Sequence, residues 1–270
     1  MLALAAPRLE VAVTGWIALD SAGGLPFAPF PDPTRERRPF APRRHALVTS
    51  WHGEGFHPAV VRALARDPGR LGAASDSLRR LLRAGSYRGV VLDLEGHQHA
   101  DSTILRTVVS AFARAARGAG ARSVTLAVPA AGGVYADPAL LALPDRVLVM
   151  LYDEHWSGSA AGPVASPGWV DEALARWRRL VPSERLVAAL PVYGYLWRNA
   201  AQGTLLSHAE LLALEARSGR SAGRDSASGG QVLALDDGGV AWYTDVEALQ
   251  RLRTVVSRYG ITRVGLWRLG

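Results

Sequence analysis

The chain of 270 residues is 49% hydrophobic and 20% charged, a composition that excludes an intrinsically disordered protein and can bury a large core. It has no cysteine, so disulfide bonds and thiolate metal sites are excluded. The formal net charge is +7, and its positive side comes from arginine alone because the sequence contains no lysine.

Short apolar runs alternate with helical stretches along the chain. This alternation predicts an α/β fold with a parallel sheet, and runs of Val, Leu and Ala are typical of strands buried on both faces. We expect strands over residues 9–17, 46–50, 89–94, 124–128, 146–151, 186–190 and 264–267. We expect helices over residues 58–65, 75–82, 102–119, 167–180, 208–218 and 245–259, where apolar residues recur at helical spacing.

Two segments interrupt this alternation. Residues 21–45 are rich in Pro, Gly and Arg and predict a long loop, and residues 219–244 predict a loop followed by a β-hairpin, 231–235 with 240–244. The length is close to the ~250 residues of a (β/α)8 barrel. We therefore expect a single TIM-type barrel domain over residues 1–270, with the hairpin as an insertion before the last helix and strand.

Seven strands are one short of a closed barrel, because residues 1–8 are too few for a further strand and helix. Either the true start lies upstream, or the chain is part of a larger protein, or it is an open seven-stranded barrel. An unpaired barrel edge would favour association with another chain.

No apolar run reaches the ~20 residues of a membrane span. Arg8 comes too early for a signal peptide, so the chain is either cytoplasmic or part of a longer exported protein.

Two carboxylates follow the apolar strand that begins at Gly89. Asp93 and Glu95 are separated by one residue, so the strand period of two directs both side chains to the same face. In a barrel, active sites lie at the carboxyl ends of the strands, which is where this acidic pair stands. Two neighbouring carboxylates repel, and one of them can hold a proton near neutral pH, which suits a general acid. The alternative is that both are solvated residues at the start of a loop.

Polar and aromatic residues also follow three later strands: Met150, Tyr152 and Asp153, then Pro191, Tyr193 and Gly194, and finally Trp267. In this order and spacing they resemble the motifs of glycoside hydrolase family 18, the chitinase-like barrels, and especially the bacterial branch similar to spore-peptidoglycan hydrolases. Residues 55–58 and the run Trp242, Tyr243 and Asp245 are also similar to that family. The resemblance extends from about residue 9 to residue 270.

The resemblance implies hydrolysis of a cell-wall or other polysaccharide that contains β-linked N-acetylglucosamine. It implies that Glu95 protonates the glycosidic oxygen and that Asp93 orients the acetamido group, whose oxygen attacks the anomeric carbon; this is the substrate-assisted exception to catalysis by two carboxylates. It further implies that Tyr152 holds the acetamido oxygen. The remaining expected sugar contacts are Asp153, Met150, Tyr193 and Trp267. Further candidates are the tryptophans Trp16, Trp51, Trp156 and Trp197. For each of these four tryptophans, ordinary packing is an equal alternative to a sugar contact.

The sequence departs from the family pattern at two positions before the acidic pair. Arg88 and Val91 stand where the family has acidic or amide residues, and the loss at Val91 would reduce activity or shift its pH profile. A lectin-like barrel that binds glycans without cleaving them is therefore an alternative function. Such relatives usually lose the acid, and Glu95 is present.

Other classes of function are less well supported by the sequence. A basic cluster in the Pro-rich loop gives non-specific attraction to polyanions, but no nucleic-acid motif accompanies it. Histidines near Glu95 and near Glu54 lack a recognised zinc spacing, and no phosphate-binding Gly-rich loop occurs. We therefore expect no metal, no cofactor and no specific nucleic-acid partner. The basic cluster consists of Arg35, Arg37, Arg38, Arg43 and Arg44, and the histidines are His97 and His99 and also His52 and His57.

Overall fold

A computed structural model describes residues 9–20, 24–25, 43–53, 55–198 and 202–268. The chain divides into two compact units, an N-terminal unit over residues 2–148 and a C-terminal unit over residues 149–270. Most of the expected loop over residues 21–45, with Arg35, Arg37 and Arg38, lies outside the described residues.

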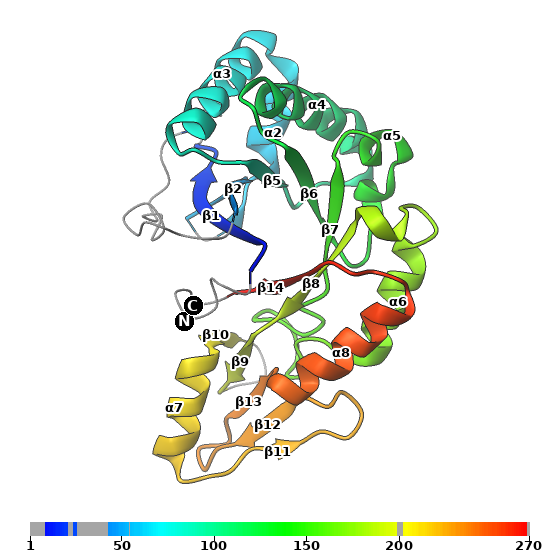
Figure 1. The fold of residues 1–270 in the computed structure, drawn as a ribbon. Coiled ribbons are helices and arrows are strands. Elements are labelled where there is room, and N and C mark those ends of the chain that lie inside the picture. The colour runs from blue at the N-terminus through cyan, green and yellow to red at the C-terminus, as the bar shows by residue number, and fades with distance from the viewer. Residues whose placement is uncertain (1–8, 21–23, 26–42, 54, 199–201, 269–270) are drawn as a thin grey trace. The chain divides into compact units, whose positions relative to one another are not determined.

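The N-terminal unit is built on parallel strands covered by helices (Figure 1). Neighbouring strands are paired in the order β1, β2, β5, β6, and a short antiparallel pair, β3 with β4, follows β2. Every residue of β5 is buried, as expected for a strand between a barrel interior and a helical layer. The strands are β1 (Val11–Ala18), β2 (Arg43–Thr49), β3 (Trp51–His52), β4 (Gly55–Phe56), β5 (Gly89–Asp93) and β6 (Ser123–Pro129), and the helices are α2 (Pro58–Arg66), α3 (Pro68–Ala84), α4 (Ser102–Gly118) and α5 (Pro138–Leu141).

Helix α4 supplies much of the core of this unit. Its apolar face includes Leu105, Val108 and Phe112, each fully buried, and burial of one such side chain contributes about 1.5–3 kcal/mol. Helix α3 begins at Pro68, seven residues before the expected start. Asp67 caps it by accepting a hydrogen bond from the Arg70 amide at 3.0 Å, and proline is well suited to the first helical position.

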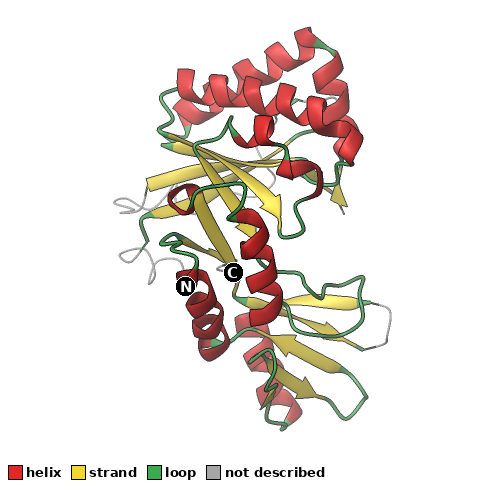
Figure 2. Cartoon of the chain, turned by 90° about the vertical axis from the view of Figure 1, so that its right-hand side faces the viewer, coloured by secondary structure: helices red, strands yellow, loops and turns green. Residues whose placement is uncertain are grey.

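The C-terminal unit contains the parallel pair β8 and β14 and a five-stranded antiparallel sheet in the order β10-β9-β13-β12-β11. The expected hairpin is present as β12 and β13, but it pairs through β13 with β9, which the sequence analysis did not predict. Figure 2 shows these elements by type. The strands are β8 (Leu186–Pro191), β9 (Tyr193–Trp197), β10 (Gly203–Ser207), β11 (Gly223–Arg224), β12 (Gln231–Ala234), β13 (Val240–Tyr243) and β14 (Val264–Trp267), and the helices are α6 (Pro167–Trp177), α7 (His208–Ser218) and α8 (Val246–Arg258).

All seven strands expected for the barrel sheet form. They follow one another in the order β1-β2-β5-β6-β7-β8-β14, and β7 (Arg146–Met150) contains the boundary between the two units. The expected α/β class with a seven-stranded barrel-type sheet is therefore confirmed. Among the described residues, no helix has the length and apolar character needed to cross a bilayer.

Candidate active site

The acidic pair lies at the carboxyl end of β5, within the N-terminal unit. Asp93 is the last residue of β5 and is only 9% exposed. Its Oδ2 accepts a hydrogen bond of 3.0 Å from the Thr49 hydroxyl, which lies opposite it at the end of β2. Interaction with the neighbouring Glu95 side chain lowers the pKa of Asp93, as the Thr49 hydroxyl does. That the two carboxyl groups share one proton stays a prediction.

The electrostatics of the pair follow from burial. Burial raises the pKa of Asp93 to about 6, although the interactions with Thr49 and Glu95 act in the opposite direction. Val91 lies on the same strand face two residues earlier and is also buried, so an apolar side chain stands beside the pair where the family has a polar one. Arg88 precedes β5 and lies at the opposite end of the strand from Asp93.

The backbone between the two acids is fixed by a tyrosine from a distant segment. The Tyr135 hydroxyl donates a hydrogen bond of 2.6 Å to the Leu94 carbonyl, and the ring is 4% exposed. Burial raises the pKa of Tyr135, and the nearby charge of Glu95 is the next cause. Tyr135 is therefore a neutral hydroxyl close to Glu95 at every pH at which a glycosidase works.

The loop after Glu95 is anchored to α2 through Asp101. Asp101 Oδ2 accepts from Arg62 at 2.9 Å and from the Gln98 amide at 3.0 Å, and it lies 3.3 Å from His97 Nδ1. Asp101 is 5% exposed and His97 is 8% exposed, so this network lies largely away from water. His97 thus has a structural partner, and no group of three residues able to hold a metal ion occurs in the described part of the chain.

The C-terminal unit gathers the second group of predicted residues. Asp153 follows β7 with a positive φ of 63°, and its Oδ1 accepts hydrogen bonds from the hydroxyls of Tyr193 and, at 2.9 Å, Tyr195. The Tyr152 ring stacks on Trp267, with 6.3 Å between centroids and 15° between planes. It also meets Tyr193 edge-on at 6.1 Å. Tyr152, Asp153, Tyr193 and Trp267 are thus brought together by the ends of β7, β9 and β14.

The structure therefore assembles two groups, each within its own unit. Asp93 and Glu95 form the first, and Tyr152, Asp153, Tyr193 and Trp267 form the second. That the two groups line a common pocket stays a prediction. The contacts of Thr49, Tyr135 and Asp101 to the acidic segment were missed in the sequence, where neither spacing nor motif marks them.

The other candidate residues have different surroundings. Trp156 is 51% exposed in the loop after β7, and Trp51 is 36% exposed and meets Phe56 edge-on at 5.0 Å. Trp16 lies half-buried in β1, whereas Met150 is buried at the end of β7. Trp197 is 2% exposed and donates to the Ser159 carbonyl, so ordinary packing accounts for it. The sugar contacts proposed for Trp16, Trp51, Trp156 and Met150 stay predictions.

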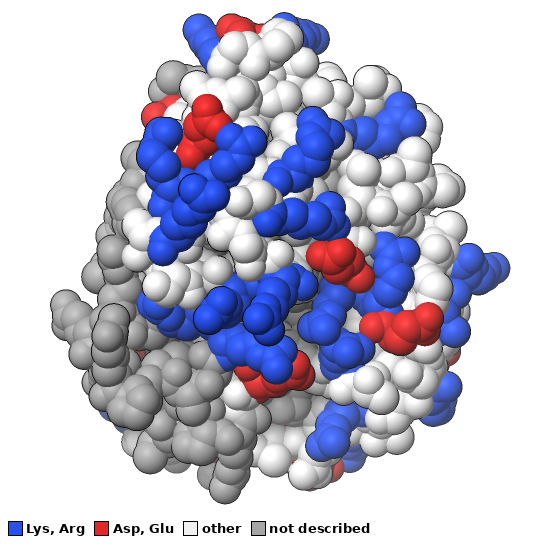
Figure 3. Space-filling model, turned by 45° about the horizontal axis from the view of Figure 1, so that its top comes forward, with Lys and Arg blue, Asp and Glu red and all other residues white. Residues whose placement is uncertain are grey.

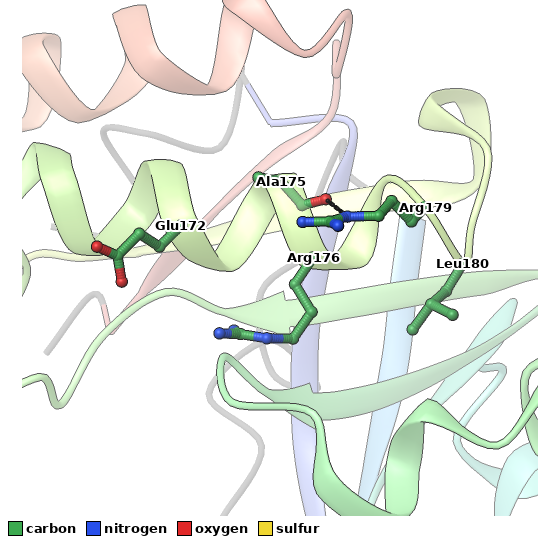
Figure 4. A pocket seen from close by; sticks show the side chains of 5 residues that line it. All are labelled: Glu172, Ala175, Arg176, Arg179 and Leu180. Atoms are coloured by element: carbon green, nitrogen blue, oxygen red, sulfur yellow. Dashed lines mark hydrogen bonds between the residues drawn. The ribbon is translucent and has the colours of Figure 1, made fainter.

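A pocket of roughly 550 Å³ lies along α6 of the C-terminal unit and contains none of the predicted site residues (Figure 4). Among the residues that line it, Arg179 Nε donates a hydrogen bond to the Ala175 carbonyl. It offers no aromatic surface for a sugar ring, so it does not compete with the acidic pair as the candidate site. Its lining residues are Glu172, Ala175, Arg176, Arg179 and Leu180.

Comparisons with known proteins agree on the class of fold. No protein-family model matches the chain. YdhD of Bacillus subtilis (strain 168), whose name marks it as a candidate sporulation-specific glycosylase, is 26% identical over 249 residues, which are 83% of this chain and 57% of YdhD. A chitinase from Chromobacterium violaceum ATCC 12472 has a TM-score of 0.85 and 21% identity, covering 100% of this chain and 89% of that one. The Bacillus cereus spore cortex-lytic enzyme SleL has a TM-score of 0.84 and 15% identity, covering 100% of this chain and 66% of SleL.

These relationships define the class of fold. The fold is that of the chitinase-type barrels, and the sequence is similar to that of YdhD. The expected likeness to the chitinase-like barrels is thereby confirmed at the level of the fold. The chain spans little more than half the length of YdhD.

Proposed function

We propose that the chain hydrolyses a polysaccharide containing β-linked N-acetylglucosamine, such as peptidoglycan, chitin or poly-N-acetylglucosamine, with retention of anomeric configuration. The observation that carries this proposal is the neighbouring carboxyl groups of Asp93 and Glu95 at the carboxyl end of a buried strand, where burial raises the pKa of Asp93. Such a pair keeps one carboxyl group protonated, which a general acid requires. The names of the relatives, a chitinase and a spore cortex-lytic enzyme, agree with this substrate class.

In the proposed reaction, Glu95 gives its proton to the glycosidic oxygen as the bond to the anomeric carbon breaks. The substrate's acetamido oxygen forms a new bond to that carbon, so no protein nucleophile is needed. Asp93, ionised once Glu95 holds the shared proton, accepts a hydrogen bond from the acetamido N–H. Water then opens the cyclic intermediate after giving a proton back to Glu95, which restores the acid.

The aromatic group of the C-terminal unit would hold the sugar. The Tyr152 hydroxyl would donate to the acetamido oxygen, and the face of Trp267 would pack against the apolar face of the pyranose. An indole provides a large rigid surface for such a contact. Asp153, fixed by two tyrosine hydroxyls, would accept hydrogen bonds from sugar hydroxyls.

The test is Glu95→Gln, which removes the transferable proton while keeping the size of the side chain. We expect turnover of N-acetylglucosamine oligosaccharides, measured as new reducing ends, to fall at least about 100-fold. Glu172→Gln, at an exposed position on α6, is the matched control and should keep full activity. Circular dichroism should show both variants folded. A near-normal rate in Glu95→Gln would remove this residue from the mechanism.

The departure at Val91 keeps a glycan-binding protein without hydrolytic activity as the second candidate. The same experiment separates the two functions. If the wild-type chain binds the oligosaccharides in calorimetry but releases no reducing ends between about pH 4 and 8, binding alone is the function. That range spans the pKa values at which carboxyl groups and histidines titrate in proteins.

A further inference from the structure

A second, smaller pocket lies in the N-terminal unit, at the end of the sheet opposite the acidic pair. It has a volume of roughly 180 Å³ and is formed where β1, β2, β5, β6 and β7 begin. Because Arg88 precedes β5 and Asp93 ends it, the full length of that strand separates this pocket from the proposed catalytic residues. Its lining residues are Glu10, Val11, Arg43, His45, Arg88, Arg122, Ser123 and Arg146.

The charge of this pocket is strongly unbalanced. Four arginines face one acid, and that acid, Glu10, forms an exposed ion pair of 3.5 Å with Arg43. Within the described parts of the chain, no acidic side chain comes within ion-pair distance of Arg88, Arg122 or Arg146. On the face shown in Figure 3, basic side chains cover more of the surface than acidic ones.

The inner wall of the pocket holds a hydroxyl with no partner. Ser123 is 9% exposed, and no hydrogen-bonding group of the described residues reaches its Oγ. Buried hydroxyls are normally hydrogen-bonded, so an unpaired one at a polar pocket indicates a ligand or water that supplies the partner. Ser123 can donate this bond to an anion held by the neighbouring guanidinium groups.

His45 completes the inner wall beside Ser123. The register aligns His45, Gly89 and Ser123 across β2, β5 and β6, and a Cβ atom at Gly89 would come within 2.6 Å of the imidazole. The ring therefore occupies the space above Gly89, next to the serine. Burial and, after it, the charges of Arg146 and Arg43 together lower the pKa of His45 to about 4, so the ring is neutral at pH 7 and can donate one N–H.

We propose that this pocket is a binding site for a single phosphate group, either inorganic phosphate or the phosphate of a small monoester. Guanidinium groups bind phosphate oxygens through paired, charge-assisted hydrogen bonds. Arg88, Arg122 and Arg146 supply these donors, and Ser123 Oγ supplies a further one from the inner wall. The volume of roughly 180 Å³ is sufficient for a compact anion such as phosphate. The acidic pair lies at the other end of β5, so phosphate does not compete with the glycan.

The experiment titrates phosphate into the whole chain by isothermal calorimetry at pH 7 and constant ionic strength. The double variant Arg88→Gln/Arg122→Gln should lose at least about tenfold in affinity. The matched control Arg66→Gln/Arg114→Gln removes the same charge from exposed helix positions of the same unit and should bind as the wild type does. Equal affinity in both double variants, or no binding to the wild type, would overturn the proposal.

Ser123→Ala provides an independent check that does not depend on net charge. Because Ser123 Oγ has no partner among the described residues, its removal should not lower the melting temperature without phosphate. It should weaken phosphate binding about tenfold, the loss expected for one hydrogen bond to a charged group. Unchanged affinity would exclude the serine and, with it, the inner wall of the site.

Glycerol 3-phosphate titrated in parallel identifies the source of the phosphate group. Tighter binding than that of inorganic phosphate indicates a monoester, and weaker binding indicates the free ion.

Discussion

At the scale of single residues, Asp93 controls the pH dependence of the proposed reaction. Burial raises its pKa to about 6, and the pair with Glu95 titrates as one unit. The general acid is present while the pair keeps its shared proton and is lost when that proton leaves. Activity should therefore be retained below about pH 6 and fall as the pH rises through the raised pKa.

Asp93→Asn tests this assignment through kcat measured against pH on N-acetylglucosamine oligosaccharides. Loss of the carboxylate should lower kcat about 100-fold or more, since the acetamido group loses its acceptor. It should also remove the falling limb near pH 6, because the carboxyl group whose pKa is raised to about 6 is gone. A variant with the wild-type rate and profile would exclude Asp93 from the mechanism.

The residue scale also shows how far sequence reasoning reaches. Strand periodicity alone placed Asp93 and Glu95 on one face, and in the structure the Glu95 side chain interacts with Asp93 closely enough to lower its pKa. The partners Thr49 and Tyr135 lie 44 and 41 residues away from the groups that they contact. Local pattern carries no information on such pairs, because they are set by strand register and by a 3-10 turn in another part of the chain.

At the scale of elements, the segment between β5 and α4 depends on one buried carboxylate. Asp101→Ala would leave His97, the Gln98 amide and Arg62 without their common acceptor. We expect a loss of about 2 kcal/mol in the free energy of unfolding, because the buried His97 ring loses its partner and the Gln98 amide and Arg62 lose a charged acceptor. The loop that carries Glu95 into η2 (His99–Asp101) should become mobile, so kcat should fall more than KM rises.

Urea unfolding and steady-state kinetics measure these two effects. Asp76→Ala is the matched control, since Asp76 pairs with Arg79 on the exposed face of α3 and should change stability by less than about 1 kcal/mol. If Asp101→Ala is no less stable than Asp76→Ala, then the buried network does not hold the loop. A stability loss with unchanged kcat would limit Asp101 to a structural role.

The elements predicted from sequence are those with a strong period and clear ends. All seven barrel strands and six helices were placed, but α3 begins earlier than expected because Gly69 and Gly72 obscure its first turns. Strand β9 was missed, although Tyr193, Tyr195 and Trp197 alternate at the period of a strand. Only one residue, Val192, separates it from β8, so the sequence analysis interpreted the residues of β9 as the loop that follows β8.

At the scale of the whole molecule, length and strand count predicted the type of fold, and the TM-score of 0.85 to a chitinase agrees with it. The complete site could not be predicted to the same degree. Its two groups come from segments separated by more than 50 residues, and only relative placement of the units decides whether they meet. The resemblance to known barrels, not periodicity, supplies that expectation.

The boundary between the units leads to a prediction about folding. It falls between Leu148 and Val149, inside strand β7, whereas independent domains are normally joined by exposed linkers. Cutting there would break a strand whose residue Val149 is fully buried. We therefore propose that the chain is one folding domain and expect a single cooperative transition in urea, with fluorescence and circular dichroism giving the same midpoint. Fragments 1–148 and 149–270, expressed separately, should lack cooperative unfolding. Two separated transitions in the intact chain, or a fragment that unfolds cooperatively alone, would show that the units are independent domains.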